Sequence, residues 1–276
     1  MSTARTLTET AERLCALSRE RAIDPVAEIV WPDAVDANAW YTSPEFVSLF
    51  GTSTWDALDD ASRKRVAFLE AVNFYSLNIH GERALIEGLA RRLYRGDHAT
   101  MSPYLHHFLE EESRHMAYFG RFCTLYAGGP YAEKKLVFPR EFAPGEEDAL
   151  FFAKVLIFEE LVDVLNRRMA KDERLHPLAH TINRLHHDDK VRHLEFGRRI
   201  TADTFERFAA TVRRTPEILE CHMVAGGFDY LIKARVSDMA AYRAFLGETL
   251  VNLPGVRETR TYAVLEEVKN TVVMGV

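Results

Sequence analysis

The 276-residue chain is poor in cysteine, with only Cys15, Cys123 and Cys221. The three residues are far apart and odd in number, and none belongs to a Cys-x-x-Cys pair. The sequence therefore indicates neither a disulfide framework nor a cysteine-based zinc site. We expect three free thiols in a reducing compartment.

Long apolar stretches are also missing. No apolar run approaches the roughly 20 residues that a membrane-spanning helix needs. The N-terminal segment MSTARTLTETAERL has no apolar signal-peptide core and is predicted to be an exposed helix. We therefore expect a cytoplasmic protein without a membrane partner.

Positive charge is not in excess. The chain has 41 acidic and 35 basic residues, a formal charge of −6. Proteins that bind nucleic acid usually carry a basic surface, so no nucleic-acid partner is expected. A chain that is 47% hydrophobic and 28% charged has the composition of an ordinary globular protein. Its length allows one large domain or two ordinary ones.

What the chain does have is a series of long helical patterns before residue 200. Apolar residues recur three and four positions apart, which is the spacing of amphipathic helices. Glycine, proline or charged residues separate the segments. Four long helices of similar length predict a helical bundle, with an irregular arm over residues 30–58 packed against it. The predicted helices cover residues 60–94, 101–126, 146–172 and 175–199.

Shorter patterns follow residue 200. Their order, helix–strand–strand–helix–strand, is that of a ferredoxin-like βαββαβ unit without its first strand. The sequence thus predicts a mainly α protein, with a helical domain over residues 1–200 and a small α+β domain over residues 201–276. The elements expected in the second domain are helices over 203–214 and 238–252 and strands over 218–224, 230–236 and 257–268.

Carboxylates and histidines recur on the long helices at ligand spacing. Glu112 and His115 are three residues apart and project from one helix face. His186 and His193 are two turns apart on one face. Carboxylates inside apolar helices are costly unless they meet a partner or a metal. Ligands shared among four helices are what a dinuclear iron or manganese site needs. The candidate metal ligands are Glu82, Glu112, His115, Glu159, His186 and His193.

Residues 1–200 resemble the di-iron N-oxygenase family typified by para-aminobenzoate N-oxygenase. The resemblance is carried by Gly81-Glu82, Glu112-x-x-His115, Glu159-Glu160 and the string from His186 to Gly197. It implies a ferritin-like bundle and O2 activation at two irons, with electrons from an external reductant. It also implies that the substrate is an amine, commonly an arylamine.

Lys190 departs from that family's pattern, because it stands where the pattern has a ligand glutamate. A protonated lysine beside two metal cations is repulsive. Three outcomes stay open: a site with one metal or none, a two-metal site with a replaced ligand, or a Lys190 that is itself a ligand or a reactive amine. Lys190 and Glu160 are the candidate catalytic residues. Asp189 points about 100° away from Lys190, so we expect it to support a metal-binding histidine.

Residues 215–270 resemble the amino-acid-sensing domain of Lrp/AsnC regulators. Gly226 and Asp229 correspond to that family's amino-acid-binding turn, and Thr259 and Thr261 lie where it places further contacts. The resemblance implies an effector site at these four residues. It also implies a homo-oligomer, because such domains commonly pair between subunits. A hairpin glycine followed by a turn-capping aspartate is the alternative explanation of the turn.

Two functions compete on this sequence. The first is an O2-dependent oxygenase of a small amine, with a C-terminal domain that senses an amino acid or holds an oligomer together. The second is a non-catalytic or metal-deficient protein that binds an amino acid or serves in assembly. The metal content of the purified protein distinguishes them, because two irons per chain favour the first function and none favours the second.

Overall fold

The structure is a computed structural model and describes residues 5–133, 146–224, 229–253, 256, 259–262 and 264. The chain divides into two compact units: residues 1–139 with 149–203, and residues 140–148 with 204–276. The described residues are mainly helical, with one two-stranded sheet, so the predicted fold class is confirmed. Among the described helices, none is long and apolar enough to cross a membrane.

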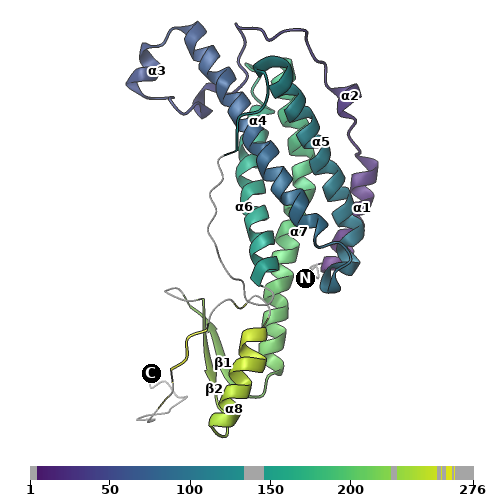
Figure 1. The fold of residues 1–276 in the computed structure, drawn as a ribbon, viewed down its shortest axis with the longest axis vertical. Coiled ribbons are helices and arrows are strands. Elements are labelled where there is room, and N and C mark those ends of the chain that lie inside the picture. The colour runs from purple at the N-terminus through teal and green to yellow at the C-terminus, as the bar shows by residue number, and fades with distance from the viewer. Residues whose placement is uncertain are drawn as a thin grey trace, which may run out of the picture. The chain divides into compact units, whose positions relative to one another are not determined.

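Long helices that lie side by side form the first unit (Figure 1). Their ends carry the expected caps: the Asp59 side chain accepts from the Ser62 N–H, and Gly128 ends a helix in the left-handed conformation with φ 77°. The predicted helical bundle is confirmed. Its helices are α4 (Asp60–Ala90), α5 (Ser102–Ala127), α6 (Glu146–Met169) and α7 (Pro177–Arg214).

The N-terminal helix is packed into the core rather than exposed, so that prediction is wrong. A capping box formed by Thr6 and Glu9 starts the helix. Leu7, Ala11 and Leu14 follow one another on one face and are buried in a cluster with residues of α5. The minor elements of this unit are α1 (Leu7–Glu20), α2 (Pro25–Glu28), η1 (Pro44–Phe46), α3 (Ser53–Ala57) and η2 (Gly96–Met101).

Two glycines on α4 allow α6 to approach closely. A Cβ atom at Gly88 would overlap the ring of Phe151, and one at Gly81 would lie 2.5 Å from Cζ of Phe158. Gly88→Ala is therefore expected to lower the free energy of unfolding by about 1–3 kcal/mol, measured by urea denaturation. Gly120→Ala on α5 is the matched control, because nothing lies within 4 Å of that Cβ position. Gly120→Ala should raise the free energy of unfolding by about 0.5–1 kcal/mol. Equal effects of the two substitutions would contradict the close approach of α6 to α4 at Gly88.

An ion-pair cluster fixes the connection between α6 and α7. Ser43 Oγ donates to Asp172 across 2.6 Å, and Arg174 Nε donates to it across 2.8 Å. The hydrogen bonds from Arg174 lower the pKa of Asp172 to about 2, although partial burial opposes them. Arg174 also donates to Glu45 across 2.9 Å.

This lowered pKa predicts a pH-dependent contribution to stability. The contribution is present above about pH 4, the pKa of an unfolded aspartate, and is lost as the pH falls towards 2. Asp172→Asn should lower the free energy of unfolding by about 1 kcal/mol at pH 7 and by less at pH 3, measured by urea denaturation. Glu173→Gln is the control, because Glu173 is exposed. An equal deficit for Asp172→Asn at both pH values would argue against an electrostatic origin.

Helix α7 continues without interruption past residue 200. The predicted break between helices over 175–199 and 203–214 is therefore wrong. The segment from Arg198 to Arg214 contains no glycine or proline. The hydroxyl of Thr201 donates to the carbonyl of Gly197 across 2.8 Å, so this polar side chain is satisfied inside the helix.

The second unit contains an antiparallel hairpin with Cys221 opposite Ile232. Phe208 and Val212 of α7 and Leu253 form its buried cluster. The units divide after residue 203, and a domain boundary at residue 200 stays a prediction. The elements are β1 (Ile218–Met223), β2 (Tyr230–Ala234), α8 (Met239–Ala244), η3 (Phe245–Thr249) and η4 (Leu250–Asn252).

The third strand, predicted over 257–268, is not present at the positions that the structure describes there. Residues 259–262 and 264 carry no strand assignment, and Tyr262 and Val264 are 83% and 81% exposed. A strand needs ladder partners on a neighbouring strand. At these positions the expectation is wrong, and the other residues of 257–268 lie outside the described part of the chain.

Candidate metal centre

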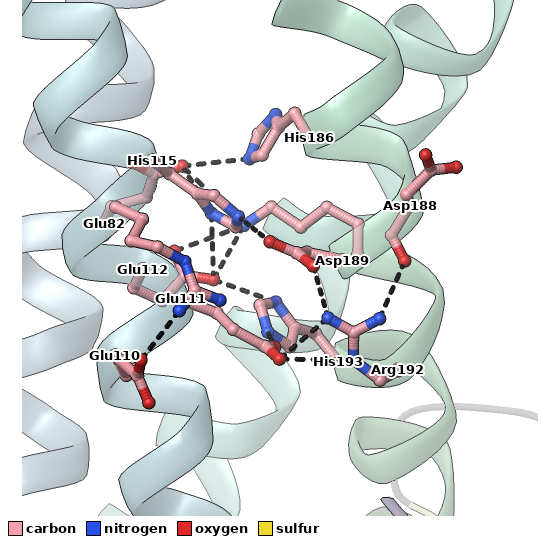
Figure 2. A network of polar contacts seen from close by, with 12 residues as sticks. Glu82, Glu110, Glu111, Glu112, His115, His186, Asp188, Asp189, Arg192 and His193 are labelled. Atoms are coloured by element: carbon pink, nitrogen blue, oxygen red, sulfur yellow. Dashed lines mark hydrogen bonds and ion pairs between the residues drawn. The ribbon is translucent and has the colours of Figure 1, made fainter. Parts of the chain in front are cut away.

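The bundle brings the six candidate ligands together in its interior. Figure 2 shows those from α4, α5 and α7 directed toward one another. Each of the six is at most 1% exposed. Their ligand atoms form two groups, each within 4.8 Å: a first triad of Glu82, His115 and His186, and a second triad of Glu112, Glu159 and His193.

In two of the histidines, one ring nitrogen points toward the other ligands, and the second ring nitrogen contacts a carboxylate on the far side of the ring. Nε2 of His115 lies 3.0 Å from Oδ2 of Asp189, and Nε2 of His193 lies 2.7 Å from Oε2 of Glu111. Such carboxylates fix the ring orientation and the tautomer of metal-binding histidines and make them better ligands. The geometry at Asp189 is therefore suited to the supporting role proposed for it.

Further supporting residues were not identified from the sequence. The amide of Asn166 lies 2.6 Å from Nδ1 of His186. Arg192, which is 4% exposed, donates to Glu111 across 2.7 Å and also to Asp189. One guanidinium thus connects the two carboxylates that stand behind the histidines. Glu111 lies in an acidic run of three residues, which is typical of a solvated helix face, so its buried position could not be predicted from the sequence.

The first triad contains buried nitrogen and oxygen atoms without hydrogen-bond partners, which is typical of metal-ligand atoms. Both carboxylate oxygens of Glu82, Nδ1 of His115 and Nε2 of His186 are buried without a hydrogen-bond partner. Nε2 of His186 nevertheless lies 3.0 Å from Oε1 of Glu82. Ligand bonds of about 2.1 Å to a shared ion place neighbouring ligand atoms roughly 3 Å apart. Two imidazoles and one carboxylate suit iron, so the first triad fits a metal ion.

Lys190 lies between the two triads. Its side chain is fully buried, and Nζ donates to Oε1 of Glu112 across 3.0 Å and to Oε1 of Glu159 across 2.8 Å. Oε1 of Glu82 is 3.8 Å away. The ammonium supplies positive charge where a metal would supply it. The second triad therefore fits an added cation less well than the first.

Burial and charge move the pKa values of these groups apart. Burial, and then the charge of Glu112, raises the pKa of Glu82 well above its usual value. Burial also opposes ionisation of Glu112, but Lys190 and His115 outweigh it and hold the pKa of Glu112 well below its usual value. Burial lowers the pKa of Lys190, and the surrounding carboxylates more than reverse this. Lys190 and Glu112 are therefore a charged pair at neutral pH.

Glu160 lies outside this cluster. Its side chain is 42% exposed, and Arg198 Nε donates to it across 2.8 Å. Adjacent residues point about 100° apart on a helix, so Glu159 and Glu160 cannot both face the interior. The structure gives Glu160 no contact with the six ligands that would support a catalytic role.

The four candidate effector residues are only partly described. Gly226 lies outside the described residues. Asp229 is exposed, and its backbone carbonyl accepts from the Val224 N–H across 3.0 Å, which closes the hairpin. Thr259 is half-buried and Thr261 is exposed. The amino-acid site therefore stays a prediction.

Part of the chain is similar to bacterial regulators. The leucine-responsive regulatory protein of Salmonella typhimurium is 62% identical over 69 residues, and those of Klebsiella pneumoniae and Escherichia coli K12 are 61% identical over 69 residues. The alignment covers 25% of this chain and 42% of each regulator, so the chain spans less than half the length of these relatives. This similarity fits the regulator-like region predicted at the C-terminal end.

The larger match is to an enzyme family. The family model described as P-aminobenzoate N-oxygenase AurF matches residues 4–243, which include every helix that contributes to the metal-ligand cluster. The match also reaches through β1 and β2 into α8. Because it covers well over half of the 276 residues, the chain belongs to the p-aminobenzoate N-oxygenase family.

Proposed function

We propose that the protein is an O2-dependent oxygenase that oxidises a small amine at iron held in the core of its bundle. Family membership supports the reaction class. The single observation that carries the proposal is the first triad, in which buried carboxylate and imidazole atoms converge without hydrogen-bond partners. Manganese suits the same donor types and is the alternative metal.

The residues of the chain would hold and orient the metal. Glu82, His115 and His186 would bind it, and Asp189 would hold the His115 ring by accepting from its Nε2–H. Bound iron would supply O2 activation, with electrons from an external reductant. The substrate amine would be oxidised at nitrogen, as the family description implies.

Aromatic side chains keep water away from the ligands. Phe108 stacks on His193 with ring centroids 3.8 Å apart, and Phe119 meets His186 edge-on with centroids 4.9 Å apart. Both phenylalanines are at most 1% exposed. Apolar walls strengthen the electrostatic interactions inside and hold the imidazole rings in place.

The test is O2 consumption coupled to an oxidised amine. Iron-loaded protein with a chemical reductant and a panel of aryl and alkyl amines should consume O2 and give N-oxygenated products, identified by mass spectrometry. His186→Ala should reduce the rate by at least about 100-fold, because it removes a ligand of the first triad. O2 uptake without oxidised amine, or equal rates in both proteins, would overturn the proposal.

One observation favours a second candidate function. Lys190 occupies the second triad with a fixed positive charge, which favours a metal-deficient protein that binds an amino acid or serves in assembly. The exposed apolar side chains Leu219, Met223 and Leu231 on the hairpin suit contact with a second copy of the chain. Sedimentation velocity at micromolar protein, with and without leucine, tests this function. A monomer in both conditions and no leucine binding would contradict it.

A further inference from the structure

We infer that the chain holds a single metal ion, bound by Glu82, His115 and His186, and that the Lys190 ammonium takes the place of a second cation. The inference rests on the metal site of the proposed function and specifies how many ions that site contains. It concerns residues of this chain at a position where the family pattern has a glutamate.

The Lys190 ammonium already contacts the carboxylates of the second triad. Nζ of Lys190 lies 3.0 Å and 3.3 Å from the two carboxylate oxygens of Glu112 and 2.8 Å from Oε1 of Glu159. Three oxygens of two ligands of the second triad thus already accept from one ammonium. Nζ cannot leave for solvent, because the side chain is fully buried. A metal ion at the second triad would have to displace it.

The charge of Lys190 also disfavours a second metal ion. The groups that line the centre include three carboxylates, Glu82, Glu112 and Glu159, and one ammonium, Lys190. Behind the ligands lie two more carboxylates, Glu111 and Asp189, and the Arg192 guanidinium that pairs with both. A second divalent ion at Glu112, Glu159 and His193 would be bound by carboxylate oxygens that lie 2.8–3.0 Å from the Lys190 ammonium, so two like charges would meet at a fully buried site. Uncompensated buried charge costs several kcal/mol, so one ion is the favoured occupancy.

The ligand types of the first triad suit a single metal ion. Two imidazoles and one carboxylate are the ligands of mononuclear non-haem iron(II) sites, which keep further positions open. The first triad has this composition, and all three side chains aim unpaired atoms at one another. In the second triad, Nδ1 of His193 lies 2.8 Å from Oε1 of Glu112, an oxygen that also accepts from Lys190, and Lys190 donates to Oε1 of Glu159 as well.

Metal stoichiometry tests the inference without relying on activity. Anaerobic loading with iron(II), removal of excess metal and elemental analysis should give one iron per chain. The nitric oxide adduct should show the electron paramagnetic resonance signal of an isolated high-spin iron. His186→Ala should lose the iron, whereas the matched variant His193→Ala should keep it, because His193 belongs to the second triad. Lys190→Glu should raise the content toward two.

Several results would overturn the inference. They are two irons in the unaltered protein, no iron in it, or equal loss in His186→Ala and His193→Ala. If either alanine variant fails to fold, as judged by circular dichroism, the glutamine variant at the same position replaces it. Two irons per chain together with amine oxidation would contradict the inference but agree with the proposed function. One iron per chain without amine oxidation would contradict the proposed reaction but agree with the inference.

Discussion

Lys190→Met is expected to lower the free energy of unfolding of the metal-free protein by about 3–5 kcal/mol. The substitution keeps most of the side-chain volume but removes the cation between Glu112 and Glu159, which are 2.8–3.0 Å from Nζ. Removing one partner from a buried ion pair leaves the other charge uncompensated, and this is the costly case. Urea denaturation after treatment with a chelator measures the loss.

The control for this experiment is Lys171→Met. Lys171 is exposed, so its substitution should change stability by less than about 0.5 kcal/mol. Iron(II) should restore part of the stability of Lys190→Met, because a divalent ion can then balance the second triad. A loss below about 1 kcal/mol for Lys190→Met would mean that the ammonium does not balance these carboxylates.

Asp189→Asn is expected to weaken iron binding by about 10- to 100-fold, the usual effect of losing a carboxylate behind a metal-binding histidine. Oδ2 of Asp189 lies 3.0 Å from Nε2 of His115, and the substitution removes the negative charge that makes the ring a stronger ligand. Competition with a chromophoric chelator measures the affinity.

The neighbouring residue provides a matched control. Asp188 is 50% exposed and pairs with Arg184 across 3.2 Å on the helix surface. Asp188→Asn makes the same chemical change one position away and should leave the iron affinity unchanged. If both variants bind iron as tightly as the unaltered protein, Asp189 does not support a ligand.

Helices and ligand-facing residues were predictable because each follows from local sequence. The helix expected over 101–126 is observed at Ser102–Ala127, since apolar spacing determines where a helix can be buried. Glu82 and Glu159 stood out because a carboxylate in an apolar helix must meet a partner. The continuity of α7 did not follow from local sequence, because the composition changes near residue 200 although the helix continues.

Contacts between helices could not be predicted in this way. Glu111 supports His193 from 82 residues away, and Asn166 approaches His186 from another helix. The place of the Lys190 ammonium also depends on how α5, α6 and α7 pack. From the sequence alone, a site with one metal or none, a two-metal site with a replaced ligand, and a Lys190 that is itself a ligand or a reactive amine were all open. The distances from Nζ to Glu112 and Glu159 favour the first.

The complete burial of the centre has a consequence for how quickly metal enters. The bundle carries its own counter-charge in Lys190, so folding does not have to wait for an ion. An ion that arrives later must pass through transient openings of the helices. The rate of uptake should therefore level off as the metal concentration rises, because opening of the protein then limits it. Variants that loosen the contact between α4 and α6 should load faster while holding the ion no more tightly.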